Sequence, residues 1–251
     1  MIKTKTKGGN SLYIRRDADS LRSDDFLKLA DRLVWIVIEM FSAFLDKTGI
    51  AEVKTSTQGR TLMLTADNSA ESVHLTRYIR FDALPKIAVT HKYFYFAPKD
   101  QDQCNSRLVL RDAINLYDKL EVKYIDLVAG AQVGGYVWAK YGFTPIEEAV
   151  SRLSEFLLRR LLALKPYIVP AYYYRAHELI GQMANDPKVI WDISDLSMPV
   201  ATDGKDQMKL GKRLLLGSYW EGEAFLSSDE VRGRWHSYLN YLDNKVAVKA
   251  E

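Results

Sequence analysis

The stretch VAGAQVGGYVWAKYGFTP, from Val128 to Pro145, joins glycines, aromatic residues and a Gly-Phe pair at a transition from strand to helix. Its glycines at 130, 134 and 135 fit a strand end and a tight helix entry, because glycine lets backbones approach closely. Gly142, just before Phe143, fits a helix exit. By itself the stretch predicts a closely packed turn, and its neighbours along the chain decide whether it also lines an active site.

The residues upstream predict a strand, a polar loop, a helix and a second strand. Residues 87–97 (IAVTHKYFYFA) give the strongest strand signal in the chain and stop before Pro98. The polar loop KDQDQCNSR follows, then a helix with apolar residues at helical spacing, then a short strand at 124–128. Such a unit normally places its loop at one edge of a sheet.

The remaining chain divides into a β-rich half and a helical half. A helix capped by Ser23 is predicted up to Gly49, followed by an antiparallel meander of strands at 50–55, 61–66 and 73–81. Helices are predicted at 147–165 and 171–185, a late strand at 212–220 (KRLLLGSYW), and a final helix opened by a Ser227/Glu230 capping box. We therefore expect a basic N-terminal arm (1–20), a domain at 21–146 and a mainly helical C-terminal extension (147–251) on the same core.

The composition limits the classes of protein to which this chain could belong. The 251 residues are 47% hydrophobic and include one cysteine, which fits a folded protein in a reducing compartment, so we expect a cytoplasmic location. No apolar run is long enough to suggest a membrane segment. The net charge is only +3, so any nucleic-acid contact would be local, at the arm around Lys3 and Arg15 or at Arg159 and Arg160.

In this order of elements, the chain resembles the GNAT acetyltransferase superfamily, and most closely a GNAT-like branch common in bacteriophage and bacterial genomes. The loop Gln101-x-x-Cys104-x-Ser106 corresponds to the superfamily's phosphate-loop pattern, and Gly142-Phe143 to its Tyr-x-x-x-Gly-Phe ending. The resemblance implies an α+β fold, with a mixed, mostly antiparallel sheet and helices on both faces.

The resemblance also implies a cofactor, acetyl-CoA. Its pyrophosphate would lie at the backbone N–H groups around the loop, and its pantetheine along the long strand, between two splayed strands. The implied binding residues are Phe94, Tyr95, Phe96, Ala97, Gln101, Gln103, Cys104, Asn105, Ser106 and Arg107.

Transfer to an amine needs a base for the amine proton and an acid for the departing thiolate. Trp138 stands where the superfamily commonly has its tyrosine, so Tyr136 or Tyr141 would protonate the thiolate. His91 is the candidate base. Each of these three residues also has a structural interpretation, as a packing residue with a satisfied polar group. The sequence contains no metal-ligand spacing.

Three functions follow, in this order. The first is an N-acyltransferase acting on a protein or small-molecule amine, which would be a host protein if the chain is phage-encoded. The second is a binding or virion-associated protein without turnover, because Cys104 and Ser106 replace loop glycines and Asp102 adds a negative charge. The third is a nucleic-acid-binding protein. The C-terminal helical part would shape the acceptor site or an interface between copies of the chain.

Overall fold

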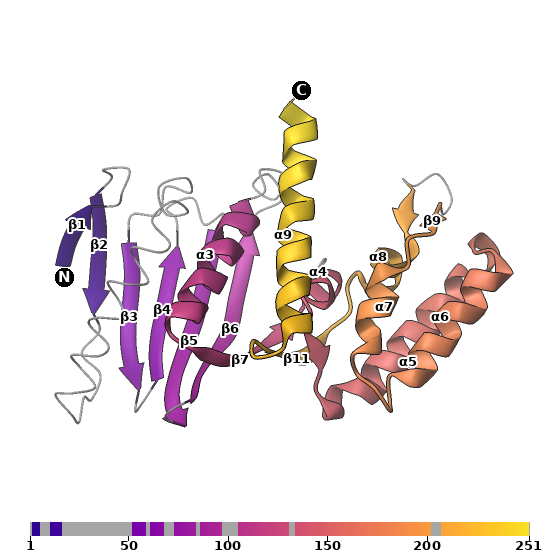
Figure 1. Ribbon diagram of the computed structural model, residues 1–251, viewed down its shortest axis with the longest axis horizontal. Helices are drawn as coiled ribbons and strands as arrows, with labels where there is room; N and C mark the ends of the chain where they lie inside the picture. Colours follow the sequence, from indigo (N-terminus) through magenta and orange to yellow (C-terminus); the bar gives the residue numbers. More distant parts are fainter. Residues whose placement is uncertain are drawn as a thin grey trace. The chain divides into compact units, whose positions relative to one another are not determined.

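A computed structural model describes residues 2–5, 11–16, 52–58, 61–67, 73–83, 86–96, 105–130, 134–201 and 207–250 (Figure 1). The chain forms two compact units. The first comprises Met1–Ile125 and Leu239–Glu251, and the second comprises Asp126–Tyr238. The observed division differs from the predicted domains 1–20, 21–146 and 147–251. The change of composition at Glu147 marks a change from strand to helix, whereas the boundary between the units falls inside a strand.

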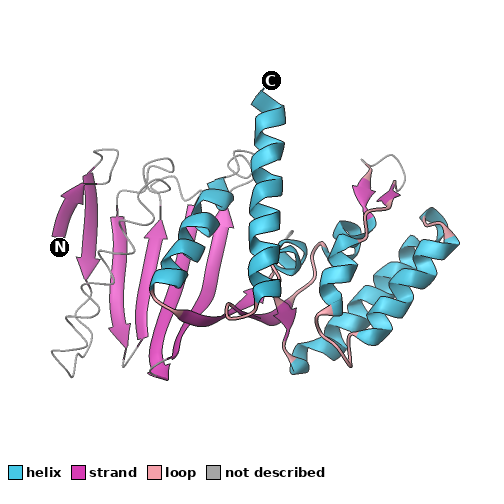
Figure 2. Cartoon of the chain, in the orientation of Figure 1, coloured by secondary structure: helices cyan, strands magenta, loops and turns pink. Residues whose placement is uncertain are grey.

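The first unit is built on a sheet with the strand order β1-β2-β3-β4-β5-β6-β7 (Figure 2). Strand β2 pairs with β3 in parallel, and the other pairs from β1 to β6 are antiparallel. The α+β class and the mostly antiparallel sheet are thus confirmed. The strands are β1 (Ile2–Lys5), β2 (Ser11–Arg16), β3 (Glu52–Gln58), β4 (Thr61–Asp67), β5 (Val73–Ala83), β6 (Lys86–Phe96) and β7 (Val122–Ala129).

Helix α3 (Asn105–Lys119) follows β6 and packs against the sheet of the first unit. Its buried side chains recur at helical spacing, and Leu110, Ala113 and Tyr117 are at most 2% exposed. On the strands, Ile79 and Val89 are directly opposite each other and equally buried. The predicted succession of strand, helix and strand is therefore confirmed, while the loop residues 97–104 lie outside the described part of the chain.

Within the predicted basic arm, strands β1 and β2 pair antiparallel. Ile2 pairs with Ile14 and Lys5 with Ser11. Strand β1 is at one end of the sheet order. The predicted helix at 23–49 is not among the described residues.

The second unit is mainly helical. Among its strands, β11 pairs antiparallel with β8, and β9 with β10. Helix α5 spans the predicted residues and ends before Pro166, and α6 begins one residue before the predicted start. The elements are α4 (Gly134–Lys140), β8 (Thr144–Pro145), α5 (Glu147–Leu164), η1 (Lys165–Tyr167), α6 (Pro170–Gln182), α7 (Val189–Asp195), β9 (Pro199–Val200), β10 (Met208–Lys209), α8 (Leu210–Leu215), β11 (Trp220–Phe225) and α9 (Asp229–Ala250).

Two predictions in this unit were wrong, and helix α7 was not predicted. The segment 212–220 is helical up to Leu215, turns at Gly217 with φ +70°, and enters β11 only at Trp220. A short leucine run fits a helix as well as a strand, so periodicity could not decide. Helix α9 is capped by Ser228 rather than Ser227: the Val231 N–H donates to Ser228 Oγ at 3.4 Å.

Aromatic side chains dominate the core of the second unit. Tyr141, Phe143 and Trp235 are completely buried, and Trp220 is 1% exposed. Gly222 makes room for this packing, because a Cβ atom there would lie 2.2 Å from the Trp220 ring.

Candidate functional site

The segment predicted to hold pantetheine begins directly after an irregularity in β6. Thr76 pairs with Tyr93 but Arg77 pairs with His91, so Lys92 is an extra residue on β6. Such a bulge bends a strand and re-aims the side chains that follow it. Beyond it, the backbone of Phe94, Tyr95 and Phe96 remains paired with β5, opposite Leu75, His74 and Val73.

The predicted phosphate-binding residues fall at the start of α3. Asn105, Ser106 and Arg107 are its first three residues, and its first turn contains no acidic residue. The first N–H groups of a helix lack intrahelical partners and, with the helix dipole, favour an anion. Ala97, Gln101, Gln103 and Cys104 lie outside the described residues.

His91 belongs to a buried polar group in the first unit. Its Nε2 atom is 2.6 Å from the hydroxyl oxygen of Tyr117, and its register partner is Arg77. All three residues are at most 3% exposed. Burial, reinforced by the charge of Arg77, lowers the pKa of His91 well below 6.5. A general base has to reach the acceptor, so this environment favours the structural interpretation of His91.

Tyr117 joins the other two members of this group. Burial raises the pKa of its hydroxyl, although the charge of Arg77 and a hydrogen bond from it act in the opposite direction. Burial also lowers the pKa of Arg77, which additionally donates from Nη1 to the carbonyl oxygen of Thr76 at 2.9 Å. Through the Tyr117 hydroxyl, this group therefore fixes α3 to β5 and β6, next to the bulge.

Tyr141 lies in the aromatic core of the second unit. Its ring centroid is 5.1 Å from that of Trp235 and 4.8 Å from that of Tyr238, both in edge-on contacts. Trp138, which stands at the position of the superfamily's tyrosine, is 7% exposed and lies 6.0 Å away, centroid to centroid. Complete burial keeps the Tyr141 hydroxyl from any substrate, which favours the packing interpretation of this residue.

Tyr136 is the predicted catalytic residue that remains partly exposed. It follows Gly135 in α4, where no side chain could fit: a Cβ atom would lie 1.9 Å from Ser218 Oγ and 2.9 Å from the carbonyl oxygen of Leu215. The absence of a side chain at Gly135 thus lets this turn of α4 pack closely against the residues that precede β11. Of the three predicted catalytic residues, Tyr136 is the one that is not buried.

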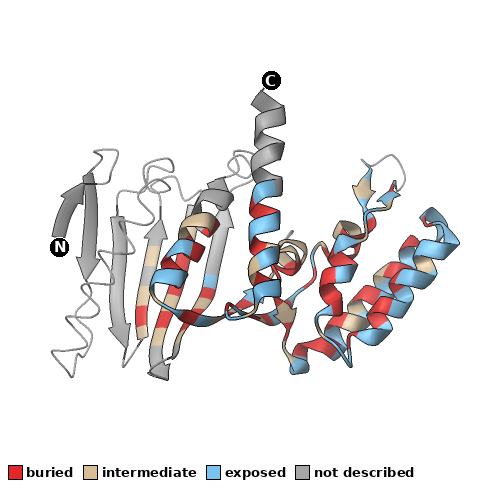
Figure 3. Cartoon of the chain, in the orientation of Figure 1, coloured by how far each residue is buried: buried red, intermediate tan, exposed pale blue. Residues whose placement is uncertain are grey.

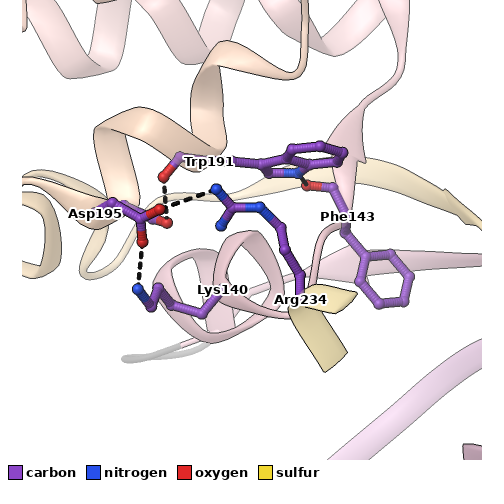
Figure 4. Close-up of polar contacts among 6 residues, drawn as sticks. Lys140, Phe143, Trp191, Asp195 and Arg234 are labelled. Carbon is purple, nitrogen blue, oxygen red and sulfur yellow. Dashed lines mark hydrogen bonds and ion pairs between the residues drawn. The ribbon is translucent and has the colours of Figure 1, made fainter. Parts of the chain in front are cut away.

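Ion pairs hold the end of α4 in place (Figure 4). The carboxylate of Asp195 in α7 accepts from Lys140 Nζ on one oxygen and from Arg234 Nη2 at 2.9 Å on the other. Nearby, the Trp191 indole N–H donates to the carbonyl oxygen of Phe143 at 3.0 Å. Burial raises the pKa of Asp195, but its two cationic partners outweigh this and the net shift is downward.

Sequence reasoning missed an acidic face on the sheet of the second unit. Exposure alternates along β11, so Glu221, Glu223 and Phe225 share the face that solvent reaches. The pKa of Glu223 is raised by partial burial and by the negative charges of Asp126, within β7, and Glu148. The signal was present in the alternation of WEGEAF, but the predicted strand ended at Trp220.

A partly desolvated carboxylate with a raised pKa is suited to accept a proton. The surplus negative charge around Glu223 also attracts a cation. Phe225, 48% exposed, and Val128, 37% exposed, add apolar surface to the two strands. We call Asp126, Glu148 and Glu223 the acidic face; its surplus negative charge suits it to bind a cationic amine.

No family model, curated protein or solved structure matches the chain. Within the described ranges, no three histidine, cysteine or acidic side chains come together as metal ligands. None of the helices described combines the length and apolar character needed to cross a bilayer.

Proposed function

We propose that the protein is a GNAT-like N-acyltransferase that moves the acetyl group of acetyl-CoA to a cationic amine. The observation that carries the proposal is the bulge in β6. It places an extra residue, Lys92, two residues before Phe94, where the strand segment that the resemblance assigns to pantetheine begins. A bulge next to a ligand-binding strand segment is a common feature of functional sites.

Pantetheine would follow the β6 backbone from Phe94 onward, and the pyrophosphate would accept hydrogen bonds from the first N–H groups of α3. The absence of acidic residues from the first turn of α3 supports this assignment. By contrast, α5 begins with Glu147 and Glu148.

The acceptor would bind at the acidic face. The acidic face would attract a cationic amine, and Glu223 would take a proton from the amine before attack. The amine nitrogen then forms a bond to the thioester carbonyl carbon, and the carbon–sulfur bond breaks. As the amide nitrogen loses its second proton, the CoA thiolate gains one; Tyr136 would give its proton to the thiolate and recover the one from the nitrogen, which returns Tyr136 to its neutral form. Its place in α4, held by Gly135 and by the Lys140–Asp195 ion pair, supports this role.

The first experiment is an isothermal titration of the protein with acetyl-CoA, using a matched pair of charge variants. Ser106→Asp adds an acid to the first turn of α3, which should stabilise that helix end but repel the pyrophosphate. Ala171→Asp adds the same charge to the first turn of α6. We expect weaker acetyl-CoA binding only for Ser106→Asp. Absence of binding to the wild-type protein at millimolar acetyl-CoA would refute the proposal.

A second candidate is a binding protein of the same fold without turnover. The burial of both His91 and Tyr141 favours it, because two of the three predicted catalytic residues cannot reach a substrate. Release of free CoA thiol in the presence of amines of different classes separates the candidates. Acetyl-CoA that binds but releases no thiol with any amine would support the second.

A further inference from the structure

Helix α5 carries a stripe of residues that remain exposed in the second unit (Figure 3). Glu155, Leu158, Leu162 and Lys165 follow one another at steps of three, four and three residues. This spacing places them on one side of a helix, as in the seam between two packed helices. Lys165 lies just beyond the end of α5 but keeps helical backbone angles, φ −47° and ψ −43°. We call these four residues the α5 stripe.

The two leucines of the stripe expose apolar side chains to solvent. Leu162 is 61% exposed and Leu158 is 37% exposed, whereas Leu157 and Leu161, on another side of the same helix, are fully buried. Beyond the helix end, Tyr167 and Val169 add more exposed apolar surface, at 37% and 56%. Apolar surface gathered in this way on a folded protein commonly marks an interface.

We propose that the α5 stripe joins two copies of the chain, with their α5 helices packed antiparallel about a twofold axis. If the axis passes midway between Leu158 and Leu162, each Leu158 meets Leu162 of the partner subunit. The same operation places each Glu155 opposite Lys165 of the partner subunit, at both ends of the contact. With a rise of 1.5 Å per residue, the four stripe positions span about 15 Å of each helix.

The charges of the stripe favour a second copy over other occupants. Its apolar centre has an acid at one end and a base at the other, which is the arrangement that an antiparallel copy complements. A nucleic acid or an anionic lipid surface would instead favour cations at both ends. Arg159, on the same exposed side, is 3.4 Å from Glu155 in its own helix. Glu155 would therefore lie between Arg159 and the partner's Lys165.

Light scattering of the full-length protein, coupled to size-exclusion chromatography over a range of concentrations, tests this inference. The wild-type protein should reach twice the 28.7 kDa mass of one chain. Glu155→Lys sets two lysines against each other, and Lys165→Glu sets two glutamates against each other. Each change should weaken the dimer on the order of tenfold. The double variant restores opposite charges and should recover most of the wild-type affinity.

Glu178→Lys is the matched control, because it makes the same charge change at an exposed side chain of α6. It should leave the dimer unchanged, and circular dichroism should show the same helix content in every variant. A wild-type protein that stays monomeric at the highest soluble concentration would overturn the proposal. So would a dimer that neither single charge reversal weakens. Either result is independent of acetyl-CoA binding.

Discussion

The Nε2 atom of His91 lies 2.6 Å from the hydroxyl oxygen of Tyr117, in the buried interior of the first unit. His91 belongs to β6, at the residue before the bulge, and Tyr117 to the helix that follows that strand. The hydrogen bond therefore ties α3 to the strand position at which the proposed pantetheine segment begins. This relationship gives His91 a structural role in the strand, without direct access to a substrate.

Removal of the Tyr117 hydroxyl should destabilise the protein. Tyr117→Phe leaves buried polar atoms of His91 and Arg77 without this oxygen, and we expect a loss of about 1–3 kcal/mol in the free energy of unfolding. Urea denaturation measures this loss. Because His91 is assigned a structural role, refolded Tyr117→Phe should still bind acetyl-CoA. If stability were unchanged, the hydrogen bond would have no structural importance.

His91 should also make stability depend on pH. Its pKa is well below 6.5 in the folded state and near 6.5 when unfolded, so the unfolded chain binds more protons as the pH falls. The contribution of neutral His91 is complete above about pH 6.5 and is lost progressively below it, at up to about 1.4 kcal/mol per pH unit. Wild type and His91→Gln should be denatured at pH values between 8 and 5, a range that brackets the pKa of unfolded histidine. The slope due to His91 should appear only in the wild type.

The ion pairs of Asp195 should contribute modestly. Asp195→Asn removes the charge that Lys140 and Arg234 share, but the carboxylate side chain is 41% exposed and solvent screens the pairs. We expect a loss of about 1 kcal/mol or less, reduced further by salt. Melting curves at low and high ionic strength check this. A loss that salt leaves unchanged would indicate a packing effect instead.

Two glycines should respond in opposite ways to the same substitution. Gly233, in α9, has no atom within 4 Å of an added Cβ, so Gly233→Ala should stabilise the protein by roughly 0.5–1 kcal/mol. At Gly222 the added Cβ would lie 2.2 Å from the Trp220 ring, so Gly222→Ala should destabilise by about 1–3 kcal/mol. Thermal unfolding of the pair is the measurement, and equal effects would contradict this description of the core.

Glu223→Gln tests the proposed base separately from cofactor binding. Its kcat for acetyl transfer should fall by roughly 10²–10⁴-fold, with the affinity for acetyl-CoA unchanged. In the wild type, kcat/KM should rise with pH through a pKa above the usual glutamate value, because partial burial and the neighbouring acids raise the pKa of Glu223. Glu221→Gln, on the same strand face, is the control. Loss of activity in both variants alike would argue against a specific base.

Local patterns predicted most of the elements. The β-branched and aromatic residues of 61–66 and 73–81, bounded by turn signals, located β4 and β5 to within a few residues, because these residue types favour strands. The predicted start of helix α5 is its observed first residue, Glu147. The leucine spacing indicated the helix, and Pro166 indicated where it ends. Where a short apolar run suits either structure, as in KRLLLGSYW, the surrounding core decided in favour of α8 and then β11.

The same distinction between local pattern and surrounding structure applies to the site residues. The sequence by itself determined the strand–helix–strand order. It also determined the strand end and helix entry at the glycines of Val128–Pro145, because propensity and backbone geometry act over a few residues. Only the tertiary structure decided that His91 and Tyr141 are buried, that Lys92 is an extra residue in β6, and that Glu223 lies beside Asp126. Burial and charge proximity depend on which distant segments meet, and no local pattern encodes that.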